Sequence, residues 1–238
     1  MEMSGWGRCV RIESKVSSFE GRRQLRQLLR DRGPCIVDGR GRSYGDSALS
    51  DRIIVSTRFD KFLHFNADSG ELICESGVSL GEIVEVLLPR GWFLPVTPGT
   101  RFVSVGGAIA SDVHGKNHHK DGCFSQFLLW LDLMLPNGEV AHCSKDENPE
   151  LFRATCGGMG LTGVILETGL RLRRVASGLV RQHGVPCLNL DDVIGKFARH
   201  GGASYSVAWI DCLARGDHLG RSILFLGEIG RASCRERV

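Results

Sequence analysis

Apolar positions in the first third of the chain switch between helical spacing and short strand-like runs. Apolar residues from Phe19 to Leu29 recur at helical spacing, so we expect an amphipathic helix that Ser17 and Ser18 cap and that ends before Gly33. Short β-branched and aromatic runs predict four strands, at 35–37, 53–55, 62–65 and 71–74. Helix and strand therefore mix from the beginning of the chain.

The mixture continues beyond these residues. A helix is expected from Ser79 to about Leu88, and an Asn137-Gly138 turn is expected between strands at 128–135 and 139–143. Further patterns predict one more helix and two more strands, at 148–154, 164–172 and 204–210. This order is not the regular strand–helix repeat of a doubly wound parallel sheet, so the expected fold class is α+β.

Composition is that of an ordinary globular protein. The 238 residues are 42% hydrophobic and 24% charged, with a net charge of +3 at pH 7. Basic residues are spread among acidic ones, so we expect no nucleic-acid partner. The most apolar run, 127–135, contains Asp132 and is shorter than the roughly 20 residues of a membrane span.

The nine cysteines are isolated along the chain, without a CxxC pair. Isolated cysteines are typical of reduced thiols, so we expect a cytoplasmic protein. Attachment to a membrane surface stays open as an alternative.

The first segment with candidate chemistry is Gly39-Arg40-Gly41-Arg42-Ser43-Tyr44-Gly45-Asp46, directly after the strand predicted at 35–37. Its glycines permit positive φ and let backbone N–H groups converge on an anion such as a pyrophosphate, and Arg42 and Ser43 offer further donors. A turn that requires glycine only for steric reasons is the alternative. The spacing matches neither GxGxxG nor the P-loop.

Residues 41–45 also match GxSxG, the pattern around the nucleophile of serine hydrolases, with Ser43 at its centre. That pattern requires a strand, a sharp turn and then a helix. The residues after Asp46 lead instead to the β-branched run 53–55, so a serine hydrolase is only a remote alternative.

A second glycine-rich segment extends from Pro98 to Gly115. Its small residues, at 104, 106–108, 110 and 111, leave room for a flat ligand against the backbone, although a Gly- and Ala-rich core helix gives the same pattern. Two such segments in one domain favour a large cofactor with phosphate groups. His114, His118 and His119 match no known zinc spacing, so we expect no metal.

Three stretches together resemble a flavoprotein family. GRGRSYGD (39–46), PGTRFVSVGGAIASDVHGKNHH (98–119) and ELFRATCGGMGLTGVI (150–165) are similar to the FAD-binding domain of the vanillyl-alcohol-oxidase-type flavoproteins. Within that family, the chain is most similar to the decaprenylphosphoryl-β-D-ribose 2′-oxidase group of FAD-linked oxidases. The similarity extends from Gly5 to about Val175, with a further match at Ala208-Trp209.

The resemblance implies an α+β fold with a two-subdomain, PCMH-type FAD-binding domain at 10–176, followed by the start of a substrate domain at 177–227. In the family, the glycine-rich segments wrap FAD with backbone donors. Carried over position by position, the implied cofactor-binding residues are Val37, Asp38, Gly39, Arg40, Gly41, Arg42, Ser43, Tyr44, Gly45, Asp46, Ser47, Gly99, Ser104, Val105, Gly106, Gly107, Ser111, Asp112, Val113, His114 and Ile165. Many relatives bind FAD covalently through a histidine of a GxGHS loop, and Arg42 in that place implies non-covalent FAD.

The resemblance also implies a reaction, in which a sugar hydroxyl carbon gives hydride to flavin N5 and an unidentified acceptor takes the electrons. Lys116 and Trp209 are the implied substrate-side residues, with a solvated lysine and a core tryptophan as the alternatives. A small-molecule or lipid-linked sugar is the expected substrate, and an epimerase or reductase is an expected partner.

Family members continue for roughly another domain's length, so we expect this chain to be incomplete, with its catalytic base in the missing part. Residues 230–238 resemble a read-through tail, and we expect residues 228–238 to be non-native. The main hypothesis is an FAD-dependent oxidoreductase of a sugar hydroxyl. A D-arabinono-1,4-lactone-type oxidase and a non-catalytic FAD-binding module are the alternatives, because the same segments serve several substrates.

Overall fold

A small parallel sheet begins the fold of the computed structural model, which describes residues 1–30 and 33–230. Its strands lie in the order β3 (Lys15–Ser18), β5 (Arg52–Val55), β4 (Ile36–Asp38), and α1 (Arg22–Arg30) connects β3 to β4. An antiparallel hairpin of β1 (Glu2–Ser4) and β2 (Arg11–Glu13) precedes it. The expected cap at Ser17 and Ser18 is wrong, because both residues pair with β5 and the helix begins only at Arg22.

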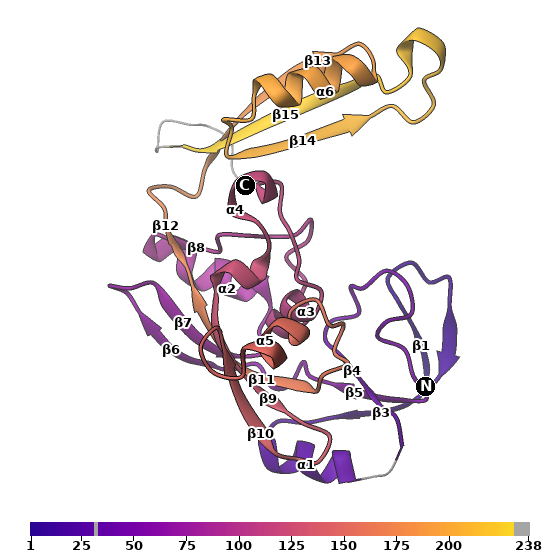
Figure 1. Cartoon of the computed structure of the whole chain (residues 1–238), viewed down its shortest axis with the longest axis vertical. Helices are drawn as coiled ribbons and strands as arrows, with labels where there is room; N and C mark the ends of the chain where they lie inside the picture. Colours follow the sequence, from indigo (N-terminus) through magenta and orange to yellow (C-terminus); the bar gives the residue numbers. More distant parts are fainter. Residues whose placement is uncertain (31–32, 231–238) are drawn as a thin grey trace.

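A five-stranded antiparallel sheet forms the centre of the molecule (Figure 1). Its order is β10 (Val140–Ser144), β9 (Leu128–Met134), β11 (Val164–Arg171), β7 (Glu71–Glu75), β6 (Phe62–Asn66). Side chains such as Leu72 and Leu131 pack with α2 (Leu80–Leu87), α3 (Val105–Ala110) and α5 (Pro149–Thr155). Leu166 packs instead with Leu25 of α1, so the two faces of the sheet belong to different clusters. This mixed architecture confirms the predicted α+β class.

Local signals explain where these helices begin. At α2 the Glu82 N–H donates to the Ser79 hydroxyl at 3.1 Å, and the Ser79 N–H donates to the Glu82 carboxylate at 2.8 Å, a complete capping box.

The second glycine-rich segment is not all loop, because it contains α3. Gly106 allows this helix to pack closely on Ser76, whose Cβ would lie 3.0 Å from a Cβ at position 106.

A separate antiparallel sheet, the C-terminal sheet, lies at one end of the molecule (Figure 1). Its order is β13 (Val180–Cys187), β15 (Ser222–Ile229), β14 (Tyr205–Ile210), and only β14 was predicted from the sequence. The helix α6 (Leu190–Arg199) covers one face by packing Val193 against Leu224. Of the segment expected to be non-native, Glu228 and Ile229 pair with β13, whereas 231–238 lie outside the described residues.

Short elements connect these layers. They are η1 (Leu88–Arg90), β8 (Trp92–Phe93), α4 (His118–Asp121), η2 (Phe124–Phe127), β12 (Arg173–Arg174) and η3 (Gly216–His218). Among the described residues, none of the helices has the length and apolar character needed to cross a membrane. The eight described cysteines all carry free thiols.

Arg22 joins α1 to the central sheet. Its Nη2 donates to the Asp132 carboxylate of β9 at 2.8 Å and also contacts the Glu167 carboxylate of β11. The Nδ1 atom of His142, on β10, lies 2.8 Å from the other oxygen of Asp132. One guanidinium therefore separates two carboxylates that stand on neighbouring strands.

Replacing Arg22 with Met would leave Asp132 and Glu167 facing each other without a cation. Because the Arg22 side chain is 36% exposed, solvent screening limits the effect, and we expect the free energy of unfolding to fall by about 1–2 kcal/mol in urea denaturation at pH 7. The matched control is Arg11→Met, whose pair with Glu2 is more than half exposed and whose loss should cost less than about 0.5 kcal/mol. Equal effects of the two substitutions would contradict a structural role for Arg22.

Candidate functional site

A cavity of about 710 Å³ lies between the two glycine-rich segments, where β4 ends and α3 begins. This volume is in the usual range for a site that takes a whole cofactor. Most of the predicted cofactor-binding residues line it, namely Val37, Asp38, Gly39, Arg40, Gly41, Arg42, Ser43, Tyr44, Gly45, Ser47, Gly99, Ser104, Gly107, Ser111 and Val113. The structure therefore brings together residues that are 60 or more positions apart in the sequence.

Six predicted residues do not line this cavity, namely Asp46, Val105, Gly106, Asp112, His114 and Ile165. Val105 and Ile165 are buried in the core of the central sheet. The Asp112 carboxylate accepts hydrogen bonds from the backbone N–H and the hydroxyl of Ser125, at 2.9 and 3.0 Å. A sequence motif identifies positions along the chain, but it does not specify where each side chain points. Around helix α3, the helix and the turns beside it set these directions.

Seven lining residues were not predicted, namely Trp6, Ala48, Pro98, Thr100, Val103, Ala110 and Met159. Most of them stand within or beside the predicted segments. Met159 comes from the GGMG break after α5, where its N–H donates to the Ala110 carbonyl at 2.8 Å. Trp6 lies inside the family resemblance, which begins at Gly5, but no cofactor role was assigned to it. The hairpin that carries Trp6 reaches the cavity only through tertiary contact.

At three glycines of the cavity, the place that a side chain would take is open space. A Cβ at Gly41, Gly45 or Gly99 would find no other atom within 4 Å, so packing does not explain these residues. Gly41 and Gly45 also have positive φ angles, of 61° and 27°. Gly39 differs, because a Cβ there would overlap the Ser104 hydroxyl. Its role is to let the two segments touch.

Unpaired nitrogen donors make the cavity suitable for an anion. The Nε atoms of Arg40 and Arg42 are buried without a hydrogen-bond partner among the described residues. The Nη2 of Arg40 donates to the Glu82 carboxylate at 3.1 Å, which leaves its Nε free. Burial raises the pKa of Asp38, and a hydrogen bond from the Gly41 N–H, at 3.2 Å, opposes that shift.

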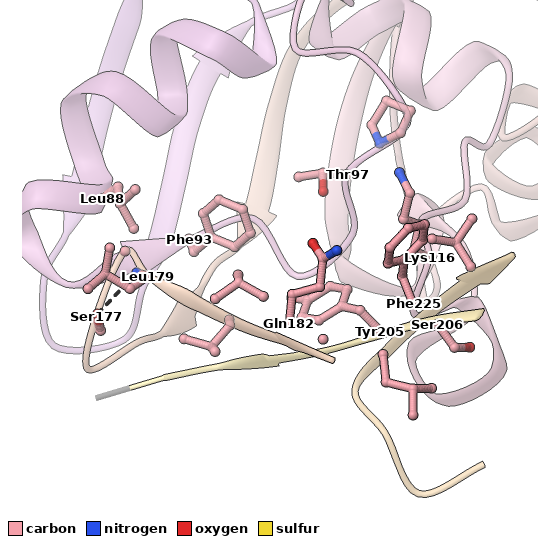
Figure 2. A pocket seen from close by; sticks show the side chains of 17 residues that line it. Leu88, Phe93, Thr97, Lys116, Ser177, Leu179, Gln182, Tyr205, Ser206 and Phe225 are labelled. Carbon is pink, nitrogen blue, oxygen red and sulfur yellow. Dashed lines mark hydrogen bonds between the residues drawn. The ribbon is translucent and has the colours of Figure 1, made fainter. Parts of the chain in front are cut away.

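The predicted substrate-side residues lie at the C-terminal sheet. Lys116 lines a second cavity, of about 360 Å³, and its carbonyl accepts a hydrogen bond from the Ser206 N–H of β14 at 2.9 Å. Figure 2 shows Gln182, Tyr205 and Phe225 of the sheet facing this space together with Lys116. Trp209 is 66% exposed on β14 and does not line this second cavity.

Neither alternative chemistry from the sequence gains support. Residues 39–51, which follow β4, contain no helix, so Ser43 lacks the strand–turn–helix setting of a hydrolase nucleophile. The Ser43 carbonyl accepts the Trp6 N–H at 2.8 Å. Within residues 1–30 and 33–230, no group of three or more His, Cys, Asp or Glu residues is placed to hold a metal ion.

Known proteins resemble the chain over most of its length. The FAD binding domain family matches residues 20–144. Decaprenylphosphoryl-β-D-ribose oxidase of Mycolicibacterium smegmatis is 34% identical over 96% of this chain and 52% of its own length. D-arabinono-1,4-lactone oxidase of Yarrowia lipolytica is 29% identical over 65% of this chain and 30% of its own length. An uncharacterized protein of Streptomyces coelicolor is 42% identical over 60% of this chain and 39% of its own length. The chain thus spans about half, or less, of these relatives.

The cavity between the glycine-rich segments fits the cofactor that these relatives imply. Open space beside Gly41, Gly45 and Gly99 admits a bulky ligand close to the backbone, and the free Nε atoms of Arg40 and Arg42 suit the two phosphates of FAD. The predicted cofactor is therefore confirmed by both family and fit. The chain belongs to the FAD-binding domain family, and over 96% of its length it is similar to decaprenylphosphoryl-β-D-ribose oxidase.

Proposed function

We propose that the chain is the FAD-binding part of an oxidoreductase that oxidises a hydroxyl group of a lipid-linked sugar phosphate. The observation that carries this proposal is that the FAD cavity and the Lys116 cavity adjoin, since Pro98 lines both. A substrate held in the second cavity is therefore next to the cofactor. The parallel sheet and the central sheet are proposed to be the two subdomains of the PCMH-type fold, with the C-terminal sheet beginning the substrate domain.

The walls of the Lys116 cavity support an amphipathic substrate. Apolar side chains, including Leu88, Phe93 and Phe225, form much of its lining and suit a lipid chain. The Lys116 ammonium is a mobile cation that suits a phosphate. Burial raises the pKa of the Tyr205 phenol, so this group stays protonated at neutral pH and can donate a hydrogen bond to the substrate.

Each part of the chain has a distinct role in this proposal. Bound FAD supplies the hydride acceptor. The glycine-rich segments bind and orient it, and Arg40 and Arg42 offset its negative charge. Lys116 and Tyr205 hold the substrate. Trp209 lies four residues beyond Tyr205 on the same face of β14, outside the cavity. The base that accepts the hydroxyl proton is proposed to lie in the part of the relatives that this chain does not cover.

The relatives' names supply a second candidate substrate, because D-arabinono-1,4-lactone oxidase is among them. A lactone carries no phosphate, so it makes no use of Lys116. We also propose a cytoplasmic location at the membrane surface, where a lipid-linked sugar presents its head group. The electron acceptor, and an epimerase or reductase that acts with the enzyme, belong to the same proposal.

Binding of a substrate beside the flavin distinguishes these substrates and does not require the base. Decaprenylphosphoryl ribose should shift the 450 nm absorbance band of the FAD-loaded protein, and D-arabinono-1,4-lactone should not. Because a hydrogen bond to a charged group is worth about 1.5–3 kcal/mol, Lys116→Met should raise the concentration for the half-maximal shift about tenfold or more. Lys145→Met, which removes an exposed lysine outside both cavities, is the control. A shift caused by the lactone alone would favour the second candidate. A bound flavin whose spectrum neither compound changes would favour a non-catalytic module.

Arg42 stands where relatives carry the histidine that bonds to FAD, so we propose a non-covalent cofactor. Precipitating the yellow protein with trichloroacetic acid should then release all of its flavin into the supernatant. The measurement is the 450 nm absorbance of the neutralised supernatant and of the redissolved pellet. Colour that stays with the pellet, or a fluorescent protein band on a denaturing gel, would contradict this assignment.

A further inference from the structure

Trp6 lies outside both glycine-rich segments yet lines the FAD cavity. Its backbone N–H donates to the Ser43 carbonyl at 2.8 Å, and its neighbour Gly5 packs so closely that a Cβ would overlap the Gly45 carbonyl oxygen. These contacts fix the N-terminal hairpin on the first glycine-rich segment. Trp6 is nevertheless 53% exposed, so it stands at the rim of the cavity, where a bound ligand can cover it.

The guanidinium of Arg42, at the rim of the cavity, lies over two aromatic rings, those of Trp6 and Phe102. Its central carbon is 4.6 Å from the centre of the Trp6 ring and 5.7 Å from that of Phe102. Both distances are within the range of a cation–π interaction. Phe102 is 53% exposed, and its ring also lies 5.3 Å from the central carbon of Arg101. Arg42 therefore contacts aromatic rings from two distant parts of the chain, and it shares the Phe102 ring with Arg101.

The charge of Arg42 has no carboxylate partner among the described residues, and its buried Nε has no hydrogen-bond acceptor. Arg40, two residues earlier, forms an ion pair with Glu82 instead. Aromatic faces fix a guanidinium in place without neutralising its charge. Arg42 is therefore a positioned, unneutralised cation that faces a cavity for an anionic cofactor.

We propose that Trp6 and Phe102 clamp Arg42 across the rim of the cavity, and that this clamp slows the release of FAD. The cation attracts the phosphates of FAD, and the rings restrict the rotamers of the arginine so that less entropy is lost when FAD binds. Trp6 and Phe102 are positioning residues in this arrangement. The inference rests on FAD as the cofactor and is independent of the sugar that is oxidised.

The rate of FAD release tests the clamp. FAD-loaded protein is diluted with an excess of a flavin-scavenging apoprotein, and the loss of bound flavin is followed by fluorescence. Trp6→Ala and Arg42→Gln should each release FAD about tenfold faster or more, whereas Trp6→Phe, which keeps an aromatic face, should remain within about threefold of the unmodified chain. Added salt should accelerate release from the unmodified chain more than from Arg42→Gln.

Phe62→Ala is the matched control, because it removes a partly exposed aromatic ring from β6, outside the cavity. Release rates of Trp6→Ala and Arg42→Gln that equal that of the unmodified chain would overturn the clamp. If Trp6→Ala does not fold, as judged by its thermal melt, the comparison of Arg42→Gln with Trp6→Phe decides the question. A chain that retains FAD but whose flavin spectrum no sugar changes would contradict only the proposed substrate, and the release rates would still test the clamp.

Discussion

The FAD cavity depends on the close approach of two glycine-rich segments, at the point where Gly39 meets Ser104. Any side chain at position 39 would occupy the place of the Ser104 hydroxyl. That hydroxyl also accepts a hydrogen bond from the Gly107 N–H at 3.2 Å and so caps helix α3. Ser104 therefore both begins the helix of the second glycine-rich segment and contacts the first segment at Gly39. Three other glycines of the cavity, at 41, 45 and 99, keep the space beyond this contact open.

The sheets hold this contact in place. The first segment leaves the end of β4, which is paired with β5 in the parallel sheet, and α3 packs into the core of the central sheet. Arg22 joins these two layers through its contacts with Asp132 and Glu167. The cavity therefore lies where the two layers meet, which explains why its walls come from residues so far apart in the chain.

Much of the cofactor site could be predicted from the sequence, because a glycine-rich segment is recognisable from its own residues. Fifteen predicted residues line the cavity. The residues that do not, such as Val105 and Asp112, share the motif but point elsewhere, since a short helix turns successive side chains to different sides. Trp6 lies within the family resemblance but could not be assigned to the cavity, because its place depends on its own backbone contact with Ser43 and on that of Gly5 with Gly45. Strand β13 was missed because it contains Gly184 and Pro186, which weaken a strand signal. Strand β15 could have been predicted, because its residues 223–226 form a continuous apolar run.

The most direct test of this account is the affinity of Gly39→Ala for FAD, measured by flavin fluorescence titration of the apoprotein. The account predicts that the dissociation constant rises about tenfold or more, because the added methyl group separates the two segments. Gly195→Ala is the control, since its Cβ would meet open space on α6 and should leave the affinity unchanged. A Gly39→Ala protein that folds and binds FAD as tightly as the unmodified chain would contradict the dependence of the cavity on this contact.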